Sequence, residues 1–96
     1  MDIKVFHNKE KSRFEVELAD EPGVLEYKAT SRKIYLIHTG VPKSNTIKGV
    51  AAALTTTALN YAKEADLEAV IICPFVKTYV KRHPELLEGL KHSFYP

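Results

Sequence analysis

The stretch HTGVPKSNTIKGVAAAL, residues 38–54, marks the point where the chain changes from a β-strand to an α-helix. Pro42 ends the strand, because proline cannot donate a ladder hydrogen bond. From Ile47 onward, apolar residues recur at helical spacing. A strand, a proline and a glycine before a helix often shape a backbone that holds phosphate. The junction is therefore a candidate phosphate-binding loop, although bulky Ile47 stands between its glycines, Gly40 and Gly49.

The strands and helices predicted before and after this junction follow a simple order along the chain. Turn-forming residues separate apolar runs that predict antiparallel strands over residues 3–7, 14–18, 24–29 and 34–39. One face of the helix is expected to hold Ile47, Val50, Ala51, Leu54, Ala58, Tyr61, Ala62 and Ala65. A continuously apolar strand at 69–73 and a short helix at 75–81 follow. The expected fold is an α+β sandwich, in which an antiparallel N-terminal meander leads through the central helix to a parallel strand.

Length and composition favour a small intracellular protein. The 96 residues suit one domain, 1–96, with a single core. No apolar run approaches the ~18 residues of a membrane span, so we expect a cytoplasmic protein with no membrane partner. The lone Cys73 and four scattered histidines lack the spacing of metal ligands, so no metal is expected. A net charge of +2 is too small by itself to indicate a nucleic-acid partner, and none is expected.

Prolines also interrupt two strands that the crossover brings side by side. Pro42 ends the fourth strand, and Pro74 follows Cys73 at the end of the fifth. Neighbouring strands that stop pairing at the same end should splay apart and leave backbone donors and acceptors facing a slot. The helix, expected to begin near Thr46 or Ile47, would point unpaired N–H groups at the mouth of this slot. An extended ligand that carries amides and a diphosphate would fit there.

Three short motifs in a fixed order resemble those of a known family. They are HTxVP at 38–42, CPFV at 73–76 and HPE at 83–85, and Gly49-Val50-Ala51 opens the helix between the first two. Over nearly the whole chain, they resemble the small single-domain branch of the GNAT acetyltransferases. The resemblance implies a GNAT-like sandwich that binds acetyl-CoA or CoA as co-substrate. It also implies acetyl transfer to an unidentified amine acceptor, which in some cases is a protein lysine.

The same resemblance implies where the cofactor binds. Pantetheine would lie between the two splayed strands, and diphosphate would sit on the loop and helix start. The residues implied along the fourth strand, the loop and the helix start are Thr39, Gly40, Val41, Asn45, Thr46, Ile47, Lys48, Gly49, Val50 and Ala51. On the short helix, Phe75 and Tyr79 lie four residues apart, so they are expected to pack either on the pantetheine arm or in the core.

The loop departs from the family's pattern of Arg or Gln, two spacers, Gly, one spacer, and Gly or Ala. Counting without gaps assigns these positions to Ser44, Ile47 and Gly49, and only the last one matches. A shift of two residues assigns them to Thr46, Gly49 and Ala51 and matches two, but it needs an insertion. We prefer the ungapped register, in which Ile47 crowds the approach of the phosphate. Weaker CoA binding than in better-matched relatives is then expected, with partial compensation from nearby lysines.

Cys73 and His38 are the catalytic candidates. A free cysteine at the end of a buried strand is commonly a small hydrophobe, but the resemblance implies that Cys73 lies near the acetyl thioester, as nucleophile or as slot lining. Counting alternate residues puts His38 on the same face as Ile34 and Leu36, where it is either a core histidine or the best candidate for a general base. The motif at 83–85 predicts a turn that ends the short helix.

Two other classes of function fit the same residues. A CoA-binding module without catalysis would keep the slot, and the degraded glycine motif favours it. A basic adaptor for nucleic acid or protein would use Lys77, Lys81, Arg82, His83 and Lys91. The sequence identifies neither the amine acceptor nor the oligomeric state, for which a monomer or a weak homodimer is expected.

Overall fold

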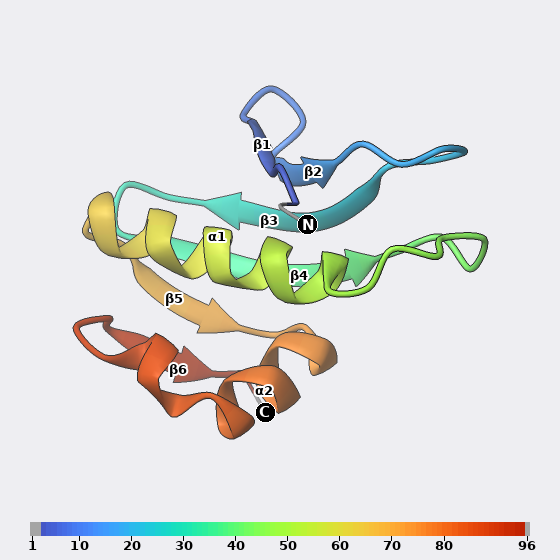
Figure 1. The fold of residues 1–96 in the computed structure, drawn as a ribbon. Coiled ribbons are helices and arrows are strands. Elements are labelled where there is room, and N and C mark those ends of the chain that lie inside the picture. Colours follow the sequence, from blue (N-terminus) through green and yellow to red (C-terminus); the bar gives the residue numbers. More distant parts are fainter. Residues whose placement is uncertain (1–2, 96) are drawn as a thin grey trace.

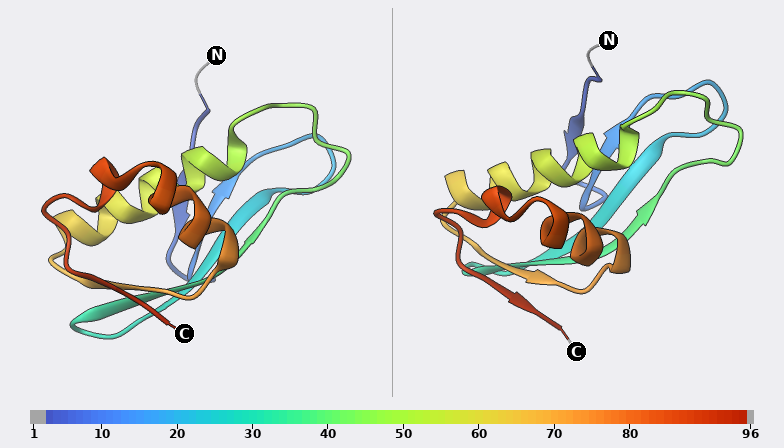
Figure 2. Two further views of the ribbon diagram at one scale, coloured as in Figure 1. Left: turned by 90° about the horizontal axis from the view of Figure 1, so that it is seen from below. Right: turned by 60° about the horizontal axis from the view of Figure 1, so that its bottom comes forward.

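A six-stranded mixed sheet with two helices on one face organises the chain, as Figure 1 and Figure 2 show. The computed structural model describes residues 3–95. The predicted domain 1–96 also includes residues 1, 2 and 96, which lie outside the described residues. In chain order the elements are β1 (Phe6–Asn8), β2 (Arg13–Val16), β3 (Gly23–Ala29), β4 (Lys33–Gly40), α1 (Val50–Glu64), β5 (Glu68–Ile71), α2 (Pro74–Arg82), the 3₁₀ helix η1 (Pro84–Leu87) and β6 (His92–Phe94).

The strands follow their sequence order across the sheet. The first four pair antiparallel, and β5 pairs parallel to β4 after the α1 crossover. This arrangement confirms the predicted meander, the crossover and the α+β class. The last strand, β6, extends the sheet by pairing parallel to β5, and the sequence did not predict it. Its three residues are too few for a periodic pattern to stand out.

The core lies between the sheet and the two helices. Helix α1 buries one face against the sheet, as its helical spacing predicts, but Ala65, which was expected on this face, is exposed and follows the helix as its C-cap. The largest fully buried side chains are Phe14, Leu25, Ile34, Leu36, Leu54, Leu59, Ile71, Val50, Val76, Val80 and Thr55. The hydroxyl of Thr55 donates to the carbonyl of Ala51 at 2.9 Å, so this polar side chain is satisfied within the helix. Figure 2 shows both helices on the same side, and we call the opposite side of the sheet the open face.

Helix α1 begins later than its apolar period predicts. The helix starts at Val50 and Gly49 is its N-cap, so the predicted start near Thr46 or Ile47 is wrong. Ile47 does not belong to the buried helical face, and 36% of its surface is exposed. The reason is the backbone of Gly49, whose φ of 86° is left-handed and therefore incompatible with a helix that continues through it.

An aromatic cluster closes the core beside β1. The His7 Nε2 atom lies 2.5 Å from the Tyr27 hydroxyl, and the His7 ring stacks on Phe14 with centroids 4.2 Å apart. Tyr61 of α1 meets the same ring edge-on at 4.5 Å. Burial, and secondarily the charge of Lys9, lowers the pKa of His7 below its ordinary value of 6.5.

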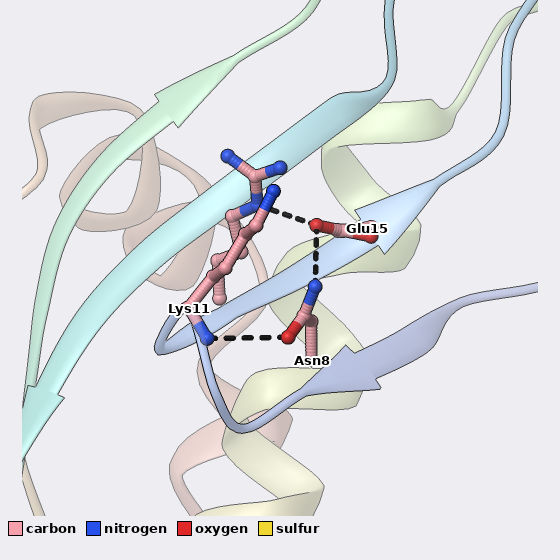
Figure 3. A network of polar contacts seen from close by, with 4 residues as sticks. Asn8, Lys11 and Glu15 are labelled. Atoms are coloured by element: carbon pink, nitrogen blue, oxygen red, sulfur yellow. Dashed lines mark hydrogen bonds and ion pairs between the residues drawn. The ribbon is translucent and has the colours of Figure 1, made fainter.

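A polar network fixes the turn between β1 and β2 (Figure 3). The backbone N–H of Lys11 donates to Asn8 Oδ1 at 3.1 Å, and Asn8 Nδ2 donates to Glu15 Oε2 at 3.1 Å. Arg13 Nε donates to the same carboxylate oxygen and pairs with it. The hydrogen bond from Arg13 is the main cause of the lowered pKa of Glu15.

Among the described residues, no helix is long and apolar enough to span a membrane.

Candidate functional site

The strands β4 and β5 separate at one end, as the paired prolines predict. Their parallel pairing runs from Lys33 opposite Glu68 to Leu36 opposite Ile71 and then stops. The backbone N–H groups of Ile72 and Cys73 both donate to the Leu36 carbonyl, at 3.0 and 2.9 Å. Beyond this shared acceptor, β4 remains paired with β3, while the segment that follows β5 turns into α2. We call the region between the end of β4 and the start of α2, where the two strands no longer pair, the slot.

A β-bulge in β4 decides which side chains face this slot. Tyr27 lies opposite Leu36, but the next residue of β3, Glu26, lies opposite His38, so Ile37 is an extra residue in β4. An extra residue reverses the alternation of all residues that follow it. His38 therefore shares the open face with exposed Glu26, and the predicted grouping of His38 with Ile34 and Leu36 is wrong.

The same reversal brings Thr39 to the helix-covered face. Thr39 lies opposite fully buried Leu25, and its hydroxyl is 3.2 Å from the thiol of Cys73. Cys73 is 3% exposed and is the residue that precedes α2. The structure thus brings Thr39 and Cys73 together across the slot, while His38 lies on the other face. Alternation counted from the sequence could not reveal this, because the bulge at Ile37 carries no glycine or proline that would mark it.

The loop between β4 and α1 presents an open helix start. Among residues 3–95, no side chain caps α1, and its first turn contains no acidic residue. The first N–H groups of an α-helix have no carbonyl partner within the helix, and they carry the positive end of its dipole. Gly49 provides the left-handed backbone that joins loop and helix. This arrangement can hold an anion through backbone N–H groups.

The loop before Gly49 is braced by one side chain. The backbone N–H of Ile47 donates to Asn45 Oδ1 at 3.1 Å, and Asn45 Nδ2 donates to the Ile47 carbonyl at 2.7 Å. The backbone φ of Ile47 is not positive. Its β-branched side chain is therefore not strained by a left-handed backbone conformation. Lys48 is exposed beside it.

Helix α2 carries a row of rings that begins just after Cys73. Phe75 stacks on Tyr79 with centroids 5.7 Å apart, and Tyr79 lies 4.4 Å from the His83 ring. Phe75 is 40% exposed, so it lies outside the core. The helix ends at Arg82, as the motif at 83–85 predicts.

The other face of α2 contacts the end of the chain. Lys77 Nζ donates to the Tyr95 carbonyl at 2.6 Å, and Lys81 Nζ lies 5.9 Å from the centre of the Phe94 ring. Two members of the proposed basic adaptor surface therefore make contacts within the chain.

Among residues 3–95, no three His, Cys, Asp or Glu side chains lie close enough to hold a metal ion.

Similarities to known proteins span all the elements that form the slot. A model of the GCN5-related N-acetyl-transferase family matches residues 13–90. Protein NATD1 of Mus musculus is 34% identical over 94 residues, covering 93% of this chain and 86% of the relative. Protein NATD1 of Homo sapiens is also 34% identical over 94 residues, covering 93% of this chain and 83% of the relative. Protein NATD1 of Danio rerio is 30% identical over 95 residues, covering 94% and 86%.

Proposed function

Because the chain belongs to the GCN5-related N-acetyltransferase family, we propose that it binds acetyl-CoA and transfers the acetyl group to an amine. The observation that carries the proposal is the end of pairing between β4 and β5 at the slot, together with the start of α1, which no described side chain caps. Splayed strands offer peptide groups to the amides of pantetheine, and the helix start offers N–H groups to a diphosphate. The proposal includes a single domain, a cytoplasmic location and a monomer or weak homodimer, as the sequence predicts.

The cofactor would follow the edge of the slot into the loop. Pantetheine is proposed to lie along residues 39–41, and the diphosphate on residues 45–51, where exposed Lys48 adds positive charge. The left-handed φ at Gly49 is the one feature of this loop that demands a glycine. It favours the register that assigns the motif positions to Thr46, Gly49 and Ala51, two of which match, over the ungapped register. In that register, Ile47 is a spacer and its bulk is tolerated.

Cys73 is the proposed nucleophile or lining residue at the thioester. In the nucleophilic route, the Cys73 thiolate attacks the acetyl carbonyl, the bond to the CoA sulfur breaks, and CoA leaves as a thiolate. The amine then attacks the acetyl-cysteine, and the thiolate of Cys73 is released. In the direct route, the amine attacks acetyl-CoA itself. In both routes the amine must first lose its proton, and His38 is proposed as the general base.

A titration with acetyl-CoA tests the binding site. Amide chemical shifts of residues 45–51 should move on addition of acetyl-CoA, since their N–H groups would contact the diphosphate. Shifts confined to other segments would mean that the site is misplaced. If no amide moves at millimolar acetyl-CoA, the protein does not have this function.

Intact-mass spectrometry then tests the chemistry. The wild-type protein should gain one acetyl group from acetyl-CoA, and Cys73→Ala should lose that adduct if the thiol carries it. An adduct that persists in Cys73→Ala excludes the thiol as its only site and favours direct transfer. His38→Ala should leave the cysteine adduct in place and slow transfer to an added amine.

A CoA-binding module without catalysis is the second candidate. The position of His38 on the face opposite to Thr39 and Cys73 favours it, because no imidazole then faces the thiol directly. This candidate predicts the same chemical-shift changes with CoA and acetyl-CoA, together with no acetyl adduct and no transfer.

A further inference from the structure

Strand β6 forms one edge of the sheet, and some of its peptide groups point away from the sheet (Figure 1). Phe94 lies opposite Ile71 of β5, and the next residue, Tyr95, donates its N–H group to the Ile71 carbonyl at 3.0 Å. In a parallel ladder, every second residue of a strand directs its N–H and C=O groups to the same neighbour. The peptide groups of His92 and Phe94 therefore point outward, where residues 3–95 contribute no further strand.

Side chains from neighbouring elements hold β6 in this position. Lys77 Nζ of α2 donates to the Tyr95 carbonyl at 2.6 Å. At the middle of the strand, Ser93 Oγ donates to Glu68 Oε2 of β5 at 3.2 Å. The edge is thus ordered by contacts within the chain, so a ligand that binds to it does not have to pay for its ordering.

The surroundings of this edge are apolar and basic. Phe94 is 41% exposed and Tyr95 is 58% exposed. Lys81 of α2, whose Nζ lies 5.9 Å from the centre of the Phe94 ring, is exposed, and so is Lys91 just before β6. Neither lysine forms an ion pair with another described residue. The edge therefore offers backbone hydrogen bonds, apolar contact and positive charge.

We propose that the outer edge of β6 binds an extended acidic peptide segment of a partner protein, which adds to the sheet as a further strand. The peptide backbone would exchange hydrogen bonds with the outward groups of His92 and Phe94. Its carboxylates would lie near Lys81 and Lys91. This interaction is independent of the proposed acetyl transfer.

Two other occupants fit the edge less well. Nucleic-acid phosphates would be attracted by the lysines, but they only accept hydrogen bonds, whereas the outward carbonyls of His92 and Phe94 need donors. A second copy of this chain would bring the same lysines to both sides of the edge, where like charges repel.

Hydrogen exchange followed by NMR tests the mode of binding. The probe is the blocked peptide acetyl-TEVDVET-amide at about 5 mM, and acetyl-TKVKVKT-amide is its control of opposite charge. The acidic peptide should slow exchange of the His92 and Phe94 amides severalfold, because these N–H groups become hydrogen-bonded. The Tyr95 amide, already bonded to β5, should change little. No protection of the two outward amides, or equal protection by both peptides, would overturn the proposal.

The other occupants have their own readouts. Tighter binding of a 12-nucleotide single-stranded DNA than of the acidic peptide would assign the surface to nucleic acid instead. A dimer in sedimentation that the acidic peptide does not dissociate would assign it to a second copy. Either result would overturn the proposal.

Two pairs of variants locate the site. Phe94→Pro and Phe94→Val both remove the ring, but only proline removes the outward N–H group, which the pairing with β5 does not use. Peptide binding should be about fivefold weaker in Phe94→Pro than in Phe94→Val. Lys91→Gln, which does not alter the strand, should weaken peptide binding severalfold at low salt, and Lys28→Gln, at an exposed position on β3, should not. Equal effects within either pair of folded variants would overturn the assignment of this edge.

Discussion

The hydroxyl of Thr39 lies 3.2 Å from the thiol of Cys73, across the point where β4 and β5 stop pairing. The two residues are 34 positions apart in the chain. The β-bulge at Ile37 is what turns Thr39 toward the thiol, since uninterrupted alternation would turn it to the open face. One irregular residue in β4 therefore determines which side chain faces Cys73.

Replacing Thr39 by valine should slow the reaction of Cys73 with thiol reagents. A hydroxyl that donates to a thiolate stabilises it, and a hydrogen bond to a charged group contributes about 1.5–3 kcal/mol, so a decrease of about tenfold or more is expected. The measurement is the rate of Cys73 modification by methyl methanethiosulfonate at pH 7.5. Thr39→Ser, which keeps the hydroxyl, is the control and should react at nearly the wild-type rate. Equal rates in Thr39→Val and wild type would show that the contact does not affect the thiolate.

Gly49→Ala should destabilise the protein and weaken acetyl-CoA binding. A residue with a side chain pays about 1 kcal/mol or more to adopt the left-handed conformation that Gly49 has, with φ of 86°. Urea denaturation should show this loss in the free energy of unfolding. Gly49→Asn should lose less, because asparagine tolerates this conformation better. A Gly49→Ala protein as stable as wild type would mean that the loop can rearrange without cost.

Ile47→Gly tests whether the loop is crowded. A helix that began near Ile47 would be weakened in its first turn by this change, but Ile47 lies outside α1, so that cost does not arise. If its side chain obstructs the approach of the diphosphate, removing it should tighten acetyl-CoA binding, measured by calorimetry. Asn45→Ala, which removes the brace on the Ile47 backbone, should weaken binding instead. Unchanged or weaker binding in a folded Ile47→Gly protein would contradict crowding and agree with a spacer role for this residue.

Prolines and apolar periods allowed the main elements to be predicted, since each reflects a local physical constraint. Pro74 marks where β5 gives way to α2, and the apolar period over 47–65 predicts most of α1. These local signals also predicted that β4 and β5 splay apart, because each strand is interrupted at the same end. The same reasoning expected both Thr39 and Cys73 near the splayed strand ends, but their contact across the slot depends on the bulge at Ile37.

The remaining features depend on contacts that the local pattern does not record. The bulge at Ile37 is a matter of register between β3 and β4, so counting alternate residues assigned His38 to the wrong face. Ile47 fits the helical period by its apolar character, yet the backbone conformation of Gly49 excludes it from α1. The segment β6 is a strand by virtue of its pairing with β5, and its three residues are too few to show a periodic pattern.

The aromatic cluster around His7 predicts how stability depends on pH. Burial and then Lys9 lower the pKa of His7 in the folded protein, so the unfolded chain, with a pKa near 6.5, binds the proton first as pH falls. The free energy of unfolding should therefore decrease as pH falls through 6.5, and this contribution should level off below the pKa of the folded state. Protonated His7 would also lie beside Lys9 and between the rings of Phe14 and Tyr61, with the Tyr27 hydroxyl as its hydrogen-bond partner.

Urea denaturation at pH 7.5 and 5.5 measures this contribution. His7→Phe removes the titrating group while keeping an aromatic ring, and it should lose less stability than wild type between the two pH values. His7→Gln serves the same purpose if the phenyl ring packs poorly against Tyr27. His92→Gln, at an exposed histidine of β6, should behave like wild type, which separates the effect of burial from that of histidine titration in general. If wild type and both His7 variants lose equal stability on acidification, the partly buried imidazole of His7 is not the group that senses pH.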